Sequence, residues 1–254
     1  MLNNYMKISD IKLEINKIKT MGDLSASEYN LDDRKGVQAA LKSRARILQK
    51  EADLIKKYET MMMHENTHPD MIIAGIDEAG RGPLAGDVVA AAVILPEDHK
   101  IIGLDDSKKV PLAKRLQLRE EIMELAEYGI GIASAAEIDQ HNIYNATKIA
   151  MQRALDQLTV KPDYLLIDAM TLDNNIEQTS LIKGDAVSNS IAAASIMAKT
   201  TRDIMMAEYD EEYPDYGFSN HKGYGTKDHL AALEKYGASP IHRKTFEPVK
   251  SMIR

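Results

Sequence analysis

Cysteine is absent from the sequence, and its absence excludes several kinds of chemistry. Disulfide bonds, thiolate catalysis and cysteine-ligated zinc are all ruled out. Any bound metal must therefore take oxygen or histidine ligands, which favours hard cations such as Mg²⁺ or Mn²⁺. His141, His221, His229 and His242 show no HExxH or similar pairing, so we do not propose a histidine zinc site.

Long apolar runs and an excess of positive charge are also missing. No segment approaches the roughly 20 apolar residues of a membrane helix. Residues 1–20 carry charges throughout and lack the apolar centre of a secretory signal. We therefore expect a cytoplasmic protein with no membrane partner. The net charge of −7, taken alone, argues against a nucleic-acid partner. That objection weakens if carboxylates that bind cations supply part of the charge, or if basic residues gather on one face.

The chain has 254 residues, enough for a catalytic core and an appendage, and its character changes near residue 70. Residues 1–68 predict a helical extension without strands. In its first helix, Ser9 is a candidate N-cap and Gly22 a candidate stop. One side of this helix carries Ile11, Ile15 and Ile18.

A second helical pattern runs from residue 33 to residue 58. Its apolar residues are spaced by four and three positions, as in a coiled-coil seam: Leu41, Ala45, Leu48, Ala52 and Ile55. A basic stripe recurs every fourth residue: Lys42, Arg46 and Lys50. Residues 61–70 predict a linker. Residues 1–68 hold 12 basic residues against 10 acidic ones, which gives only a weak electrostatic attraction for a polyanion. Our hypothesis is that the stripe nevertheless aids substrate binding, and unchanged KM and stability after deletion of residues 1–68 would refute it.

From residue 69 onward, strand and helix patterns alternate, so we assign residues 69–254 to one catalytic domain. Predicted strands cover residues 71–76, 87–95, 128–135, 164–167 and 179–182. Predicted helices cover residues 112–127, 144–158 and 188–209. Three early strands followed by alternating helix and strand predict an α/β fold, with a mixed sheet flanked by helices.

Four acidic residues stand at the ends of predicted strands. Asp77 and Glu78 follow the first strand, Asp168 follows the fourth, and Asp185 follows the fifth. Sites in open α/β sheets form where strands end. Carboxylates gathered there would supply ligands for two divalent cations roughly 4 Å apart, which phosphodiester cleavage uses to activate water and stabilise the leaving oxygen. Packed together without a metal, such like charges are unfavourable. Each residue also has an ordinary interpretation as a solvated turn residue, and Asp185 suits a helix N-cap, so spacing alone leaves both open.

Two glycine-containing loops add to this pattern. Residues 77–86 read DEAGRGPLAG, in which Gly80, Arg81 and Gly82 would either expose backbone N–H groups to a ligand or form an ordinary turn. Residues 221–226 read HKGYGT, in which Tyr224 either stacks on a sugar or base or packs into a tight turn. Lysines in the loop that begins DSKK at Asp106 suit either phosphate contacts or solvent.

Taken together, these motifs resemble the ribonuclease HII family. In the family's order, they are GIDEAGRGPLAG from Gly75, DSK from Asp106, EID from Glu137 with Asn142-Ile143, LID ending at Asp168, KGD ending at Asp185, AAASIMAK from Ala192, HKGYGT from His221 and PIHR from Pro240. The resemblance covers about residues 71–250. A dozen matched residues around DEAGRG are far more specific than a lone glycine motif.

The resemblance implies a ribonuclease H-like fold with a central five-stranded mixed sheet flanked by helices. It implies that Asp77, Glu78, Asp168 and Asp185 are catalytic and bind two Mn²⁺ or Mg²⁺ ions, with Asp77 bridging both. The implied activity is endonucleolytic hydrolysis of the RNA strand of RNA/DNA hybrids. It includes cutting 5′ of ribonucleotides embedded in duplex DNA, as ribonucleotide excision repair requires, and leaves 5′-phosphate and 3′-hydroxyl ends.

The same resemblance implies how RNA is told from DNA. The backbone of Gly80, Arg81 and Gly82 would read the 2′-hydroxyl, and Tyr224 would stack on the deoxyribose 3′ of a ribonucleotide. Lys108 and Ser195 are expected to contact the substrate. Readout of the sugar predicts little base-sequence specificity. We expect a monomer.

Three other functions compete with this interpretation. Another two-metal enzyme of this fold class, an exonuclease or a phosphatase, would not need a 2′-hydroxyl. A non-catalytic nucleic-acid-binding module would show no Mn²⁺-dependent cleavage. A scaffold that uses the apolar seam of the extension is compatible with catalysis, and sedimentation of residues 1–70 tests it.

Overall fold

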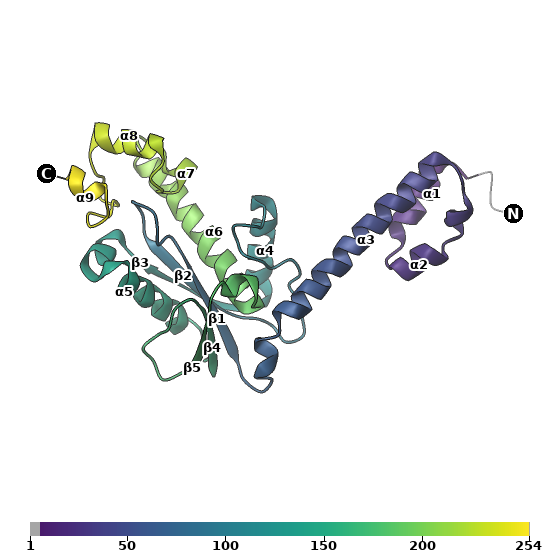
Figure 1. The fold of residues 1–254 in the computed structure, drawn as a ribbon, viewed down its shortest axis with the longest axis horizontal. Coiled ribbons are helices and arrows are strands. Elements are labelled where there is room, and N and C mark those ends of the chain that lie inside the picture. Colours follow the sequence, from purple (N-terminus) through teal and green to yellow (C-terminus); the bar gives the residue numbers. More distant parts are fainter. Residues whose placement is uncertain (1–5, 254) are drawn as a thin grey trace. The chain divides into compact units, whose positions relative to one another are not determined.

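The computed structural model describes residues 6–253 and divides into two compact units, residues 1–59 and 60–254 (Figure 1). Residues 1–5 of the expected extension lie outside the described residues. The first unit contains α1 (Ile8–Lys17), α2 (Met21–Ala26), the 3₁₀ turn η1 (Glu28–Leu31) and most of α3 (Lys35–Met61).

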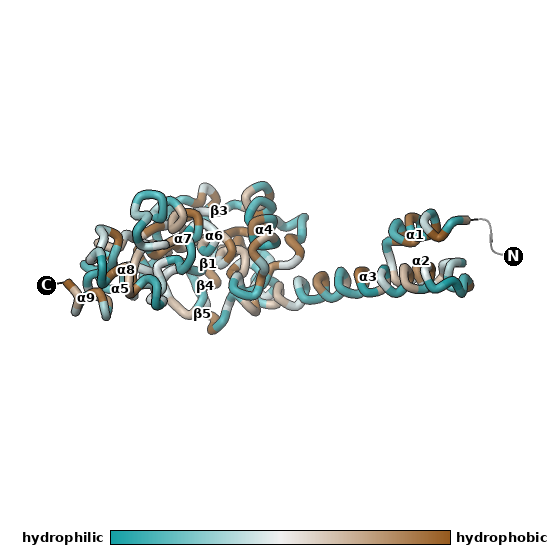
Figure 2. Tube along the Cα trace, turned by 90° about the horizontal axis from the view of Figure 1, so that it is seen from above, coloured by the Kyte–Doolittle hydropathy of each residue, from teal (hydrophilic) through white to brown (hydrophobic). Residues whose placement is uncertain are grey.

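The core of the first unit lies between α1, α2 and the first half of α3. Its buried residues are Ile11, Ile15, Leu24, Val37, Leu41 and Leu48. The Arg44 side chain of α3 donates a hydrogen bond from Nε to the Ile18 carbonyl at 2.8 Å, which ties α3 to the end of α1. Figure 2 shows α3 as mainly hydrophilic, with hydrophobic residues recurring along it.

Two sequence predictions for this unit were wrong, and a third holds only in part. Ser9 is not an N-cap, because α1 begins at Ile8 and Lys7 precedes it without a side-chain cap bond. Gly22 does not stop α1, which ends at Lys17; it lies inside α2, whose N-cap is Thr20. The predicted seam is buried only in part, since Ala52 is exposed and Ile55 is 44% exposed. The ten residues of α1 extend about 15 Å, whereas the 27 residues of α3 extend about 40 Å, so α1 covers only part of α3.

The second unit is built on a five-stranded mixed sheet in the order β3-β2-β1-β4-β5. The strands are β1 (Ile73–Ala79), β2 (Val88–Ile94), β3 (Glu127–Ala133), β4 (Tyr164–Asp168) and β5 (Glu177–Leu181). The other elements are η2 (Glu65–Thr67), α4 (Leu112–Leu125), α5 (Ala135–Asp156), η3 (Gly184–Ala186), α6 (Asn189–Glu212), α7 (Phe218–His221), α8 (Lys227–Tyr236) and α9 (Val249–Met252). The first three strands pair antiparallel, while β4 pairs parallel with β1 and with β5. The expected mixed five-stranded sheet with flanking helices is confirmed.

Alternation along β1 separates the two faces of the sheet. Ala74 and Ile76 belong to a core cluster with Ala146 and Ala150 of α5. Gly75 instead faces α6, because a Cβ at this position would lie 2.1 Å from the Ser190 carbonyl carbon. The sheet therefore lies between α5 and α6, as Figure 1 shows.

The main differences from the predicted elements concern β1, α5, α8 and the expected linker. Strand β1 continues to Ala79, so Asp77 and Glu78 lie inside it. Helix α5 begins about ten residues earlier than expected, because Ser134 and Glu137 form a capping box, and its kink at Asn142 conceals the helical period. Helix α8 was not anticipated. The expected linker, residues 61–70, contains η2 and the buried Glu65. Among the described residues, no helix is both long and apolar enough to cross a membrane.

Candidate active site

Strand register places Asp77 beside Asp168. Strand β1 pairs parallel with β4, with Ile76 opposite Ile167, so the next residue of each strand follows on the same edge. Ile76 and Ile167 belong to the α5-side core, which turns both aspartates toward α6. Asp77 is 5% exposed and accepts a hydrogen bond from the Glu78 N–H at 2.7 Å.

The turn after β5 brings Asp185 to the same place. The Gly184 N–H donates to Asp168 Oδ1 at 2.6 Å, which ties the turn to the end of β4. The Asp185 carboxyl feels the charges of both Asp168 and Asp106, so it lies close to the other acids. Asp185 is not the N-cap of α6; Ser188 fills that position and accepts from the Ile191 N–H at 3.3 Å.

Burial and mutual repulsion raise the pKa values of three of the four predicted acids. Burial, followed by the charge of Glu78, raises the pKa of Asp77 well above its usual value, although a hydrogen bond from Ser195 opposes the shift. Burial also raises the pKa of Glu78, against the attraction of Arg81. For Asp185, burial and then Asp106 raise the pKa to about 6. Acidic groups with raised pKa values gathered in one place are typical of a functional site.

A fifth acid, Asp106, lies beside Asp185 and had no role in the sequence prediction. Burial acts to raise its pKa, but the Lys108 N–H at 3.0 Å and the charges of Lys108 and Lys109 outweigh burial and lower it. Lys108 also lowers the pKa values of Glu78 and Asp185. Its ammonium group therefore lies near the acids, on the exposed side of the cluster.

The donor set fits divalent cations that share their coordination with substrate. Among residues 6–253, no group of three acidic or histidine side chains is gathered tightly enough to hold an ion alone. Mg²⁺ sites commonly use one or two carboxylates together with water and phosphate oxygens, so an open arrangement is suitable. Glu78 Oε2 is buried without a hydrogen-bond partner in the described structure, which is a further oxygen available to a cation.

Two buried arginines shape the loop that follows β1. Arg243 is fully buried and donates to the carbonyl oxygens of four loop residues: Gly80, Arg81, Pro83 and Gly86. Arg202 donates to the Ala85 carbonyl at 3.0 Å and to the Asp87 carbonyl at 2.9 Å. Gly80 adopts φ +99°, and a Cβ there would lie 2.1 Å from Arg202 Nε. Only glycine fits at this position.

These carbonyl contacts determine where the loop N–H groups point. In a trans peptide, a carbonyl and the N–H that follows it point in opposite directions. Because the carbonyls of Gly80 and Arg81 face the arginine, the N–H groups of Arg81 and Gly82 face away from it. Burial, followed by the charge of Arg202, lowers the pKa of Arg243 to about 9. The cationic group that binds the loop carbonyls is therefore largely shielded from water.

Tyr224 lies beside this loop and is 48% exposed. A Cβ on Gly82 would lie 3.6 Å from Tyr224 Cε1, and the Leu84 N–H donates to the Gly223 carbonyl at 2.8 Å. The ring is therefore next to the glycine loop and open to a ligand. Ser195, by contrast, is buried, and its Oγ forms a hydrogen bond with Ser107 Oγ at 3.0 Å, which leaves little surface for a substrate.

Two buried histidines hold the Tyr224 backbone. The Ser239 N–H donates to His242 Nδ1 at 2.9 Å, so the proton of the neutral ring is on Nε2. That Nε2–H donates to His229 Nε2 at 3.0 Å, which leaves the His229 Nδ1–H to donate to the Tyr224 carbonyl at 2.9 Å. Burial, followed by His229, lowers the pKa of His242 to about 4, in agreement with a neutral pair.

Comparison with known proteins assigns both parts of the chain. The model of the Ribonuclease HII family matches residues 74–249, and that of the Ribonuclease HII N-terminal domain matches residues 7–68. The chain belongs to the ribonuclease HII family. Ribonuclease HII from Staphylococcus aureus (strain MSSA476) is 54% identical over 253 residues, which cover 98% of this chain and 99% of that protein. The sequence resemblance is thus confirmed, and the chain is an endoribonuclease of the ribonuclease H type.

Solved structures show the same fold. Ribonuclease H2 from Pyrococcus horikoshii OT3 is 26% identical with a TM-score of 0.61, and the match covers 71% of this chain and 96% of that one. Bst-RNase HIII, solved in complex with Mn²⁺, is 18% identical with a TM-score of 0.54, and the match covers 71% of this chain and 68% of that one. The second likeness shows the fold alone.

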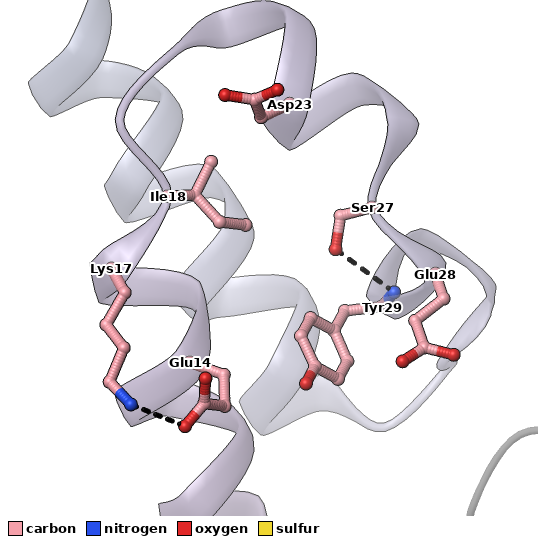
Figure 3. A pocket seen from close by; sticks show the side chains of 7 residues that line it. All are labelled: Glu14, Lys17, Ile18, Asp23, Ser27, Glu28 and Tyr29. Atoms are coloured by element: carbon pink, nitrogen blue, oxygen red, sulfur yellow. Dashed lines mark hydrogen bonds and ion pairs between the residues drawn. The ribbon is translucent and has the colours of Figure 1, made fainter.

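In this ribonuclease HII chain, the first unit has a hollow of its own between α1, α2 and η1 (Figure 3). Glu14, Asp23 and Glu28 line it, and its one basic residue, Lys17, is paired with Glu14 at 2.8 Å. Such a lining repels a phosphate backbone. The basic stripe on α3, formed by Lys42, Arg46 and Lys50, is by contrast exposed and carries no acidic residue.

Sequence reasoning assigned no role to Arg202, Arg243, Asp106 or the two histidines of the Tyr224 support. Arg243 and His242 stand in the matched PIHR motif and Asp106 begins DSK, so their signal was present in the ribonuclease HII resemblance. Composition and spacing gave no indication of them, because their contacts span up to 163 residues.

Proposed function

We propose that the protein cleaves the RNA strand of RNA/DNA hybrids and cuts on the 5′ side of single ribonucleotides in duplex DNA. The observation that carries the proposal is the adjacency of two features. The acids Asp77, Glu78, Asp168 and Asp185 adjoin a loop whose Arg81 and Gly82 N–H groups face away from the protein interior. Acids suit the hydrolysis of a phosphodiester, and free N–H groups suit a ribose hydroxyl.

In the proposed mechanism, Asp77, Glu78, Asp168 and Asp185 would hold two Mn²⁺ or Mg²⁺ ions. Bound there, such ions would lower the pKa of water and stabilise charge on the leaving oxygen. The chain's own residues orient the substrate: the N–H groups of Arg81 and Gly82 bind the 2′-hydroxyl. Tyr224 stacks on the next sugar, and Lys108 attracts a phosphate. The buried contact of Ser195 with Ser107 suits a supporting role better than the substrate contact expected from the resemblance.

A cleavage assay tests the proposal. The substrates are a DNA duplex with one ribonucleotide, the matching all-DNA duplex and a continuous RNA/DNA hybrid, each with Mn²⁺ or Mg²⁺. We expect cuts 5′ of the ribonucleotide and along the hybrid, none in DNA, and none with Asp77→Asn. Folded wild type that cuts no ribonucleotide-containing duplex would leave only a nucleic-acid-binding role. Cleavage of the all-DNA duplex would indicate a nuclease of another type.

We further propose that residues 1–68 aid substrate binding through Lys42, Arg46 and Lys50, all of which are exposed. Action as a monomer in the cytoplasm stays a prediction from the sequence. Size-exclusion chromatography with light scattering tests the first of these, and fractionation of cells tests the second.

A further inference from the structure

Residues 64–68, HENTH, match the HExxH pattern in which two histidines one helical turn apart bind zinc. The structure does not support that use. Only Glu65–Thr67 form a 3₁₀ turn, so His64 and His68 do not share the face of an α-helix. The His68 ring instead stacks on Tyr164, with ring centroids 4.0 Å apart. The acid inside this run has different surroundings.

Glu65 is 8% exposed and is bound to the beginning of α6. A single oxygen, Oε1, accepts three hydrogen bonds there. Ser188 Oγ donates at 2.7 Å, Ser190 Oγ at 2.7 Å and the Ser190 N–H at 3.0 Å. The family's N-terminal domain, matched over residues 7–68, thus ends with a carboxylate buried in the catalytic unit.

These contacts stabilise the first turn of α6 for three reasons. The Ser190 N–H is one of the helix's first N–H groups, which have no partner inside the helix. A negative charge at the N-terminus of a 24-residue helix interacts favourably with the helix dipole. Hydrogen bonds to an ionised acceptor are also stronger than neutral ones. Loss of the acceptor would leave buried donors without a partner.

The first turn of α6 also contacts the segments that carry the four acids. Its Ser190 backbone lies against Gly75 of β1, two residues before Asp77, where a Cβ would lie 2.1 Å from the Ser190 carbonyl carbon. Its Ser188 N–H donates to the Gly184 carbonyl at 2.8 Å. Gly184 in turn donates to Asp168 Oδ1. A shift of this turn therefore moves the Asp168 and Asp185 side of the site relative to Asp77.

We propose that Glu65 is a positioning residue for the cation site: it fixes the first turn of α6 and, through it, the spacing of the four acids. The inference rests on the proposed function of those acids. It gives the end of the N-terminal domain a task inside the catalytic unit, separate from duplex binding by the basic stripe. No step of catalysis passes through Glu65 itself.

The test uses the full chain with Glu65→Leu, which keeps the side-chain size and removes the acceptor, and Glu65→Gln, which keeps an acceptor oxygen. Asn66→Ala, an exposed position in the same turn, is the matched control. Mn²⁺ binding without substrate is measured by electron paramagnetic resonance of the free ion, and kcat and KM are measured at saturating Mn²⁺. Circular dichroism establishes the temperature range in which each variant is folded.

We expect Glu65→Leu to weaken Mn²⁺ binding roughly 10-fold or more, as changes in groups that orient metal ligands do. We expect kcat to fall and KM for the duplex to stay unchanged. Glu65→Gln should retain Mn²⁺ affinity to within about fivefold, because only the charge is lost. Asn66→Ala should match the wild type. A folded Glu65→Leu protein with wild-type Mn²⁺ affinity and kcat would overturn the proposal and leave Glu65 a purely structural role.

Ser190→Ala decides the matter if Glu65→Leu does not fold, since it removes one of the three hydrogen bonds and keeps the N–H. A smaller loss of Mn²⁺ affinity in the same direction supports the proposal, and unchanged affinity overturns it. Failure of the proposed function is recognised separately, because it would appear in the wild type as an absence of Mn²⁺ binding and of cleavage.

Discussion

At the scale of the residue, Asp77 is expected to oppose stability while it serves activity. Its raised pKa means that the charged form is disfavoured in the folded, metal-free protein, first by burial and then by Glu78. Asp77→Asn should therefore abolish cleavage and raise the Tm of the metal-free protein by about 2 °C or more. Mn²⁺ should raise the Tm of the wild type but not of the variant. Differential scanning calorimetry with EDTA or Mn²⁺ measures both effects, and a lower metal-free Tm for Asp77→Asn would contradict the expectation.

His242 makes the stability depend on acid. Its folded pKa is about 4, below the usual 6.5, so between these values only the unfolded chain takes up the proton. The stability that neutral His242 contributes is present above pH 6.5 and is lost as the pH falls to about 4. In urea unfolding with EDTA, the free energy of unfolding should fall less steeply between pH 6.5 and about 4 for His242→Gln than for the wild type.

Comparing wild type with His242→Gln separates the effect of His242 from that of Asp185. The folded pKa of Asp185 is about 6, so Asp185 changes the stability in the opposite direction over part of the same pH window. In the metal-free protein, the contribution of Asp185 to the free energy of unfolding is greatest below pH 3.8 and is lost as the pH rises to about 6. Equal slopes in wild type and His242→Gln would show that the histidine pair does not stay neutral in the folded protein.

At the scale of the element, the contact between β1 and α6 leaves no room for a side chain at residue 75. Gly75→Ala should lower the free energy of unfolding by about 1–3 kcal/mol, because its Cβ would meet the Ser190 backbone rather than a movable side chain. Gly22→Ala is the control: it lies inside α2, its nearest contact would be Thr20 Oγ1 at 3.7 Å, and alanine favours helix. Gly22→Ala should be neutral or stabilising by up to about 1 kcal/mol. Equal effects of the two substitutions on the free energy of unfolding in urea would contradict the expected lack of space at residue 75.

Elements were predictable from sequence where the pattern was local. The apolar runs of β1, β2 and β4 and the alanine-rich α6 carried their own signal, and the order of strands and helices predicted the mixed sheet. Boundaries failed where a cap or a kink decided them, as at Ser134 and Asn142 of α5. The convergence of Asp77 with Asp168 depends on the register of β1 against β4, which spacing alone does not specify.

Two sets of long-range contacts near the site could not be predicted for a related reason. Arg243 bonds to loop carbonyls about 160 residues earlier in the chain, and Glu65 bonds to serines 123 and 125 residues later. Contacts between residues so far apart in the sequence produce no local periodicity or spacing from which they could be predicted. Arg243 stands in the matched PIHR motif but was assigned no role, whereas Glu65 was assigned to a linker.

At the scale of the whole molecule, the two units are expected to divide binding and chemistry. Replacing Lys42, Arg46 and Lys50 with Gln should raise KM for the duplex and leave kcat unchanged, since these exposed residues belong to the first unit. Each lost phosphate contact should reduce the slope of log binding constant against log salt by about 1.

The control replaces three exposed lysines of the same unit, Lys7, Lys12 and Lys19, and so changes the net charge equally. Fluorescence anisotropy with a non-cleavable duplex over a range of salt concentrations measures the slopes. Equal slopes for the two triple variants would mean that the stripe acts only through net charge.

The arginine support of the glycine loop also bears on how the protein is made. Residues 80–86 leave the ribosome early, but the guanidinium group that holds their carbonyls belongs to a residue about 160 positions later. The loop cannot take this carbonyl-bound shape before that later part has been synthesised. If the loop reads the 2′-hydroxyl as proposed, a nascent chain that ends before Arg243 would carry Asp77 and Asp168 without the means to distinguish ribose from deoxyribose.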